Sequence, residues 1–168
     1  MQIRAVLNPS TYHGTYQKPP FFEGWYFKMV SADEKNKIAI IPGVILGKDA
    51  HAFVQLIDGL DGHTEYFTFP LEQFHADFPQ FRLAIGANQF DSSHLVVDIS
   101  QPEGQLFGEV KFGKLNPWPV TFFSPGVMGW FAWVPKMECY HGVLSFDHSL
   151  QGKLTLNGKD MDFTAGRG

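Results

Sequence analysis

Short apolar segments separated by turn-forming residues recur along the whole chain, and this spacing is the feature that most restricts the fold. The 168 residues include 17 glycines and 11 prolines. Breaks at this frequency leave room for strands, which need only about five residues, but not for long helices. The sequence therefore predicts an all-β protein.

About nine or ten strands are expected, with at most one short helix over residues 71–78. Asn157-Gly158 is the strongest hairpin signal, and residues 59–62 form a second turn of this kind. An antiparallel up-and-down barrel can hold one small ligand, as lipocalins do. We therefore expect a single lipocalin-like β-barrel domain over residues 1–168, or an open, strongly curved sheet in which the barrel is incompletely closed. The expected strands are residues 21–30, 38–46, 50–58, 63–69, 81–85, 94–100, 105–112, 137–146, 153–156 and 159–163.

The composition is rich in aromatic residues and poor in charge. Aromatic residues make up 15% of the chain, with 17 phenylalanines, and charged residues only 18%. This balance is typical of a domain that lines a cavity as well as packing a core. The net charge of −4 argues against nucleic acid, or an anionic membrane surface, as the main partner.

The sequence gives weak indications of location. A single cysteine, Cys139, excludes an internal disulfide and favours a reducing compartment. The first ten residues lack the pattern of a signal peptide, and the longest apolar runs, residues 38–46 and 126–134, are shorter than a transmembrane helix requires. We therefore expect a soluble, cytoplasmic protein with no transmembrane segment, although a peripheral membrane contact stays open.

Residues 116–142 combine three of the four tryptophans with four prolines and three glycines. Almost every side chain in this stretch is apolar, and the few polar groups come together at its end. A mostly apolar wall with a few placed polar groups is typical of a ligand pocket. The alternative is a proline-rich loop that packs its aromatic residues over the open end of a core. The candidate substrate-binding residues here are Trp118, Phe123, Trp130 and Trp133.

Glu23 is the most informative single residue. In a strand over residues 21–30 it shares a face with Phe21, Trp25, Phe27 and Met29. Desolvation on such a face favours the neutral acid, which could then donate a proton near neutral pH. The alternative is a structural carboxylate that is paired with an arginine or with backbone donors. Trp25 and Phe27 are further candidates for substrate binding.

A second group of candidates lies in the expected strand 137–146. Glu138 and Tyr140 share one face and could form a donor pair, whereas His141 lies on the other face with Cys139. His13 is expected to approach this region, because Tyr-His-Gly occurs both at residues 12–14 and at residues 140–142. A lone histidine more often has a hydrogen-bonded structural role. The histidine spacings match no metal-binding motif, so neither a metal nor a cofactor is expected.

Two blocks of this chain resemble the tocopherol cyclase family. The first is Tyr12-His13-Gly14 followed by Phe-Phe-Glu-Gly-Trp-Tyr-Phe-Lys at residues 21–28. The second is residues 116–142, followed by Ser145, Asp147-His148 and the closing Gly-Arg-Gly at residues 166–168. Together the blocks cover roughly 40% of the chain and are specific. Family members are about twice as long, so the chain resembles an amino-terminal half, whose partner would be the missing second half or a second copy in a homodimer.

The resemblance implies a lipocalin-like barrel that cyclises a prenylated hydroquinone to a chromanol, with no redox cofactor or metal. An acid must protonate an alkene, the phenol must be held close, and water must be excluded. Glu23, or Glu138 with Tyr140, could supply the proton, and His141 is a further candidate. Two alternatives remain: a non-catalytic binder of a hydrophobic isoprenoid or lipid, and a carotenoid or isoprenoid alkene hydratase.

Overall fold

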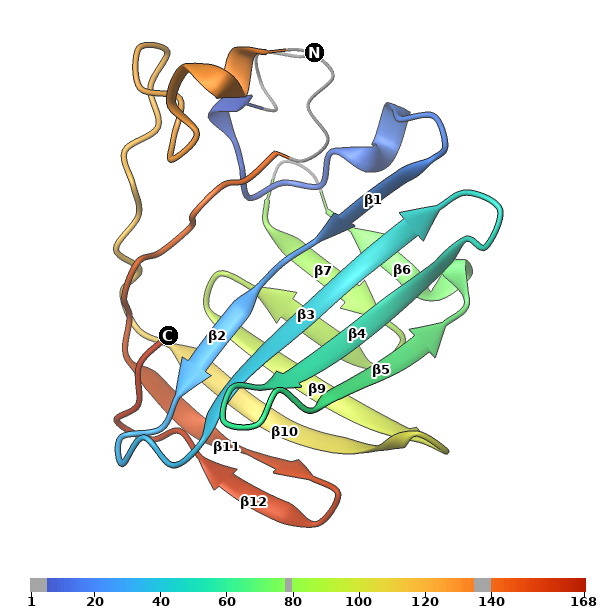
Figure 1. The fold of residues 1–168 in the computed structure, drawn as a ribbon, viewed down its shortest axis with the longest axis vertical. Coiled ribbons are helices and arrows are strands. Elements are labelled where there is room, and N and C mark those ends of the chain that lie inside the picture. Colours follow the sequence, from blue (N-terminus) through green and yellow to red (C-terminus); the bar gives the residue numbers. More distant parts are fainter. Residues whose placement is uncertain (1–5, 78–79, 135–139) are drawn as a thin grey trace.

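Two antiparallel β-sheets face each other in this protein (Figure 1). The computed structural model describes residues 6–77, 80–134 and 140–168. No helical element among these residues reaches seven residues, so the prediction of an all-β protein is confirmed. The described strands do not close into a barrel, which corresponds to the incompletely closed form of the expected fold.

The first sheet has five strands and the second has seven, and the second sheet runs in strict sequence order. The first sheet has the order β1-β3-β4-β5, with β2 also paired to β3: β1 (Phe21–Gly24), β2 (Phe27–Val30), β3 (Lys37–Leu46), β4 (His51–Asp58) and β5 (Thr64–Phe69). The second sheet contains β6 (Phe74–Ala76), β7 (Arg82–Ile85), β8 (Asn88–Asp91), β9 (His94–Gln101), β10 (Gly104–Phe112), β11 (Leu150–Leu156) and β12 (Lys159–Asp162). Three 3₁₀ turns complete the elements: η1 (Gly14–Tyr16), η2 (Leu71–Gln73) and η3 (Gly129–Trp133).

The expected strand 21–30 is divided into β1 and β2, and Pro42 explains the break. Both halves keep the same register on β3, with Gly24 opposite Gly43 and Phe27 opposite Ile40. The N–H of Trp25 donates to the Pro42 carbonyl at 3.0 Å. Because proline has no N–H, it cannot return a ladder bond at this point.

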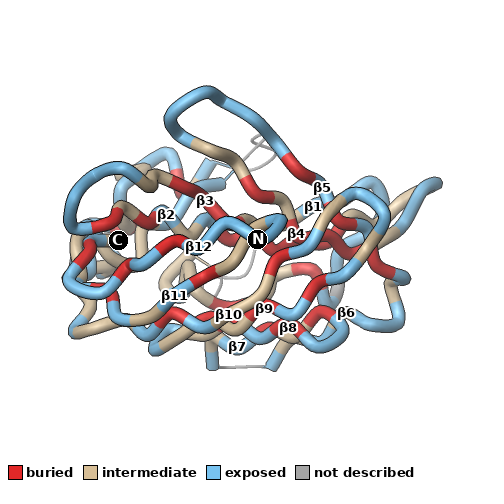
Figure 2. The backbone as a smooth tube through the Cα atoms, turned by 90° about the horizontal axis from the view of Figure 1, so that it is seen from below, coloured by how far each residue is buried: buried red, intermediate tan, exposed pale blue. Residues whose placement is uncertain are grey.

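The space between the sheets is filled by one continuous hydrophobic cluster. Ile40, Leu56 and Phe67 from the first sheet, and Leu95 and Leu154 from the second, are almost completely buried. Figure 2 shows buried segments of both layers facing each other, with exposed segments alternating along the strands. This alternation is the period of two expected for sheets with one wet face. The expected hollow centre is therefore packed.

The last residues of the chain join the two sheets along one side. Val30 and Arg167 exchange backbone hydrogen bonds at 2.8 and 2.9 Å, and the N–H of Leu150 donates to the Gly166 carbonyl at 2.9 Å. The side chain of Arg167 forms an ion pair with Asp147. The carboxyl-terminal Gly-Arg-Gly therefore links β2 of the first sheet to the start of β11 in the second.

Three local expectations were wrong. The expected helix over residues 71–78 is only η2 followed by β6, and residue 78 lies outside the described residues. Strand β8 was not anticipated. The expected strand 137–146 is absent over residues 140–146, which are irregular, and residues 137–139 lie outside the described part of the chain. The alternation of faces inferred for that segment therefore does not hold for Tyr140 and His141.

Glycine positions in the β10–β11–β12 region give a stability prediction. Gly152 and Gly158 both have positive φ, +143° and +80°. A Cβ at Gly152 would collide with the carbonyl oxygen of Glu109, whereas a Cβ at Gly158 would meet nothing within 4 Å. We expect Gly158→Ala to lower the free energy of unfolding by about 1 kcal/mol, from backbone strain alone. Gly152→Ala should lower it by about 3 kcal/mol or more, because the strands must also separate. Urea unfolding of both variants measures the difference, and equal losses would contradict the close approach of β10 and β11 at Gly152.

Candidate functional site

Glu23 and His13 form a hydrogen-bonded pair. The backbone N–H of His13 donates to Glu23 Oε2 at 2.8 Å, and His13 Nδ1 lies 2.5 Å from Glu23 Oε1. The side chains are only 15% and 25% exposed, for Glu23 and His13 respectively. Both carboxyl oxygens are therefore engaged by one residue.

The placement of Glu23 follows from β1, in which alternate residues turn inward. Phe21 and Glu23 are half-buried, whereas Phe22 and Gly24 are exposed. The expectation that Glu23 shares a face with Phe21, Trp25 and Phe27 therefore matches the structure. Glu23 is not an isolated acid among apolar groups, however, because His13, ten positions earlier, binds its carboxyl group.

Tyr12 places a phenol beside this pair. Burial, and secondarily the negative charge of Glu23, raises the pKa of the Tyr12 hydroxyl above its usual value. The group therefore stays protonated at neutral pH. Its ring contacts Phe74 at a centroid distance of 5.2 Å and Trp25 at 6.3 Å. Tyr12 thus connects the Glu23–His13 pair to a larger set of aromatic rings.

These rings form a continuous row between the two sheets, which we call the aromatic stripe. Trp25 stacks on Phe74 and on Phe81, with centroid distances of 6.4 and 6.3 Å. Phe27 stacks on Phe81 at 6.1 Å and on Phe112 at 5.6 Å. Neighbouring rings at such separations stabilise each other beyond simple burial. The stripe comprises Tyr12, Trp25, Phe27, Phe74, Phe81 and Phe112.

His148 lies at the other end of the stripe. Its ring meets Phe112 edge-on at 5.2 Å, and Nδ1 lies 3.2 Å from Ser145 Oγ. Burial lowers the pKa of His148, against a smaller opposing effect of the Asp147 charge. The Ser145 hydroxyl also accepts the Asn116 N–H at 2.9 Å. The cluster therefore ties the two ends of the long β10–β11 connection together beside the stripe.

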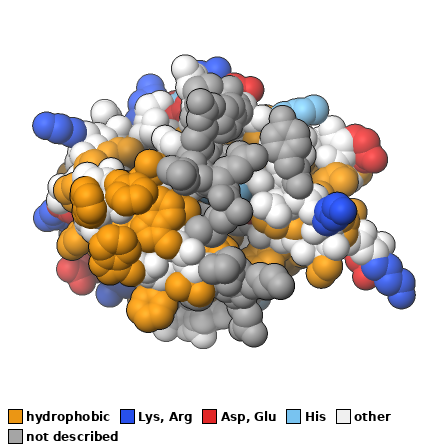
Figure 3. Space-filling model, turned by 90° about the horizontal axis from the view of Figure 1, so that it is seen from above, with side chains coloured by type: hydrophobic (Ala, Val, Ile, Leu, Met, Phe, Trp, Pro, Cys, Tyr) orange, Lys and Arg blue, Asp and Glu red, His pale blue; other side chains and the backbone are white. Residues whose placement is uncertain are grey.

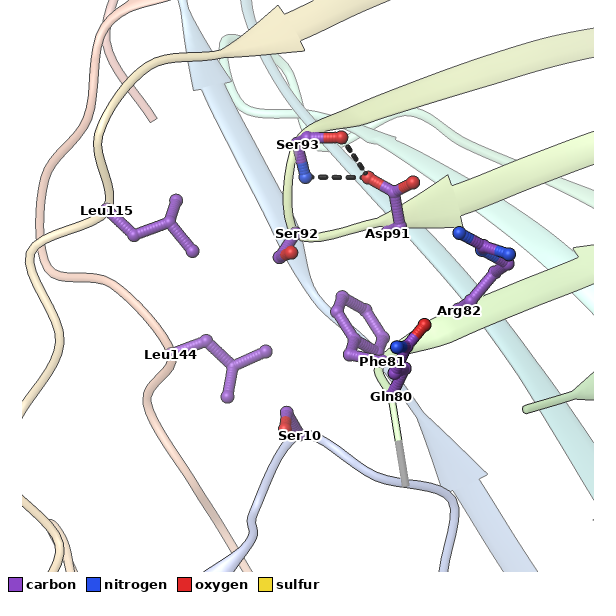
Figure 4. Close-up of a pocket in the computed structure, with 9 residues that line it drawn as sticks. All are labelled: Ser10, Gln80, Phe81, Arg82, Asp91, Ser92, Ser93, Leu115 and Leu144. Carbon is purple, nitrogen blue, oxygen red and sulfur yellow. Dashed lines mark hydrogen bonds between the residues drawn. The ribbon is translucent and has the colours of Figure 1, made fainter. Parts of the chain in front are cut away.

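An open cleft of about 490 Å³ adjoins the stripe. This volume is within the range of about 300–1,000 Å³ found for small-molecule sites. Figure 4 shows Leu115 and Leu144 on one side, facing Phe81 and Ser92 on the other. The lining residues are Ser10, Gln80, Phe81, Arg82, Asp91, Ser92, Ser93, Leu115 and Leu144.

Two residues connect the cleft to the stripe. Phe81 lines the cleft and stacks on both Trp25 and Phe27. Ser10 also lines the cleft, and its carbonyl accepts the Trp25 indole N–H at 3.3 Å. A ligand in the cleft would therefore contact the Phe81 ring of the stripe directly. Ser10 would lie between that ligand and Trp25.

The predicted site residues fall into two groups. Glu23, His13, Trp25 and Phe27 belong to the pair and the stripe. The aromatic residues of the 116–142 stretch do not line the space between the sheets: Trp118, Phe123 and Trp130 are 45%, 79% and 62% exposed. Trp133 is half-buried, and its indole N–H is buried without a hydrogen-bond partner. The described residues of this stretch therefore do not form the expected pocket wall inside a barrel.

Tyr140 and His141 lie in an exposed part of the β10–β11 connection. The Tyr140 hydroxyl donates to the Val134 carbonyl at 2.7 Å, and the His141 N–H lies 3.1 Å from Met128 Sδ. Gly142 packs against Pro9, so the second Tyr-His-Gly triplet lies beside the amino-terminal segment. His13, however, pairs with Glu23. Glu138 and Cys139 lie outside the described residues.

Sequence reasoning missed five residues of this region: Tyr12, Phe74, Phe81, Phe112 and His148. Tyr12 could have been included, because it stands directly before His13 in a motif that was already singled out. Phe74, Phe81 and Phe112 come from the second sheet or its edges, and no local pattern brings them to Trp25. Asp147-His148 has local structural contacts, because His148 bonds to Ser145 and Asp147 pairs with Arg167.

The described part of the chain holds no group of three or more His, Cys, Asp or Glu side chains placed to bind a metal ion. Over the same residues, no helix has the length and apolar character needed to cross a bilayer. Comparisons with family models, with curated proteins and with solved structures found no match for this chain.

His148 gives a prediction for stability against pH. Because burial lowers its pKa in the folded chain, the unfolded chain binds the proton more readily. The contribution of His148 is complete above the unfolded value of about 6.5 and is lost as pH falls below it. We expect His148→Gln to lose less stability than the wild type between about pH 6.5 and 5.5. His75→Gln removes an exposed imidazole from β6 and should retain the wild-type slope. Thermal unfolding over this range is the measurement, and parallel slopes for all three proteins would contradict the assignment.

Proposed function

We propose that this protein binds a prenylated hydroquinone in the cleft and cyclises it to a chromanol, with the Glu23–His13 pair as the acid. The observation that carries the proposal is the hydrogen bond between these two residues at the edge of a row of aromatic rings. The resemblance of the two sequence blocks to tocopherol cyclases supports the same reaction. His13 and Glu23 both belong to the first of those blocks.

The proposed reaction is an isomerisation, so it requires no co-substrate. The pair transfers a proton to one alkene carbon of the prenyl chain, which leaves a tertiary carbocation on the other. The phenol oxygen then forms a bond to the cation, and the phenol proton returns to the pair. The carboxyl and imidazole groups can hold and release this proton as one unit, since they already share a hydrogen bond.

The aromatic stripe supports this chemistry in two ways. Aromatic faces attract a cation, so the rings of Trp25, Phe74 and Phe81 would stabilise the carbocation as it forms. Phe81 offers an apolar surface to the prenyl chain, together with Leu115 and Leu144 on the opposite wall of the cleft. Positioning the phenol near the alkene would contribute further to the rate.

A second candidate is hydration of the same alkene. The cleft is open and carries Arg82, Asp91, Ser92 and Ser93 beside its apolar residues. Water admitted there could capture the carbocation in place of the phenol, giving a tertiary alcohol. The polar lining is the observation that favours this alternative. A binder without catalysis would use the same cleft and leave its ligand unchanged.

Incubation of the protein with a prenylated hydroquinone in D₂O tests the proposal. We expect a chromanol that carries a single deuterium on carbon, because the pair exchanges its proton with solvent. Glu23→Gln should lower the rate by roughly 100-fold or more, as expected for loss of a general acid. Mass spectrometry of the products is the measurement.

Glu109→Gln is the matched control, because Glu109 is a partly exposed carboxylate of β10 outside the stripe. It should retain the wild-type rate. A tertiary alcohol as the product would identify a hydratase. Saturable binding with unchanged substrate would identify a binder, and an undiminished rate in Glu23→Gln would remove Glu23 from the mechanism.

A further inference from the structure

The β10–β11 connection exposes a concentration of large apolar side chains, which we call the apolar loop surface. Phe123, Trp130 and Phe131 are 79%, 62% and 65% exposed. Single exposed apolar residues are common, but clusters of them mark interaction sites. The surface comprises Trp118, Phe122, Phe123, Val127, Trp130, Phe131 and Val134.

The segment that carries this surface has no charged residue of its own. Residues 115–134 contain no Asp, Glu, Lys, Arg or His. Figure 3 shows the hydrophobic side chains gathered over one side of the upper face, with charged groups around its margin. Burying such a surface requires no charged group to lose its hydration.

Part of the backbone of this segment is paired by local hydrogen bonds. The N–H and carbonyl of Thr121 bond to Ser124 at 2.8 and 3.2 Å, and the N–H of Gly126 donates to the Ser124 carbonyl at 2.8 Å. Around η3, the N–H of Phe131 donates to the Met128 carbonyl, and the N–H of Val134 donates to the Phe131 carbonyl. Unpaired backbone groups are costly in an apolar medium, so local pairing suits a segment that leaves water.

We propose that the apolar loop surface inserts into the headgroup region of an uncharged, zwitterionic lipid bilayer. Trp and Phe are side chains that partition to this region, where an apolar ring meets a polar boundary. The chain has a net charge of −4 and the surface lacks lysine and arginine, so attraction to anionic lipid is not the driving force. The surface presents irregular backbone instead of an open strand edge, which disfavours a partner that adds a strand.

This inference goes beyond the proposed function and does not depend on it. An inactive chain could bind lipid, and an active one could take its substrate from solution. The contact would be peripheral, through a few bulky side chains at one end of the molecule.

Flotation with phosphatidylcholine vesicles tests the inference. The wild type should float with the vesicles, and adding phosphatidylglycerol should not strengthen binding. The double variants Phe122→Ser/Phe123→Ser and Trp130→Ser/Phe131→Ser should each lower the partition coefficient by at least about tenfold. Leu60→Ser is the control, since Leu60 is 56% exposed in the β4–β5 turn, outside the apolar loop surface. Its binding should match the wild type.

A second measurement needs no variant. Brominated lipids should quench the emission of the exposed Trp118 and Trp130, whereas Trp25, which is 7% exposed, should be protected. Absence of flotation, or flotation only with anionic vesicles, would overturn the proposal. A wild-type dimer that fails to bind vesicles and becomes monomeric in the loop variants would also overturn it, because a second copy would then cover the surface.

Discussion

Aromatic packing between the two sheets is the contact on which the geometry of the site depends. Phe81, which directly precedes β7 of the second sheet, stacks on Trp25 and Phe27 at the break between β1 and β2. The described strands do not close into a barrel, so these rings hold the sheets together where no ladder does. Phe81 also borders the open cleft. This one ring therefore takes part both in the packing of the sheets and in the lining of the cleft.

The Glu23–His13 pair adds chemistry to this cluster by fixing the amino-terminal segment onto β1. That segment also carries Tyr12, whose ring joins the aromatic stripe, and Ser10, whose carbonyl holds the Trp25 indole. A change in the pair would therefore affect the protonation of the site and the position of one cleft wall together. His148 at the far end of the stripe holds the other wall in a similar way, through Ser145 and Asn116.

The sequence predicted what depends on local spacing. Alternation placed Glu23, Trp25 and Phe27 on one face, and Asn157-Gly158 marked a true hairpin between β11 and β12. It could not predict that His13 would bind Glu23, because the partner of a buried carboxyl is set by tertiary contacts. The 116–142 stretch shows a second limit: an apolar, proline-rich composition is the same for a pocket wall and for an exposed surface. Alternation also misled over residues 140–146, where irregular backbone carries a strand-like pattern.

The central claim is that the aromatic stripe and the Glu23–His13 pair form one ligand site. A crystal structure with a bound prenylated hydroquinone tests it most directly. We expect the prenyl chain to lie against Phe81 between Leu115 and Leu144, with the phenol end directed toward Tyr12 and Glu23. A ligand found only on the exposed aromatic residues of the β10–β11 connection, with the stripe and the pair untouched, would contradict the account.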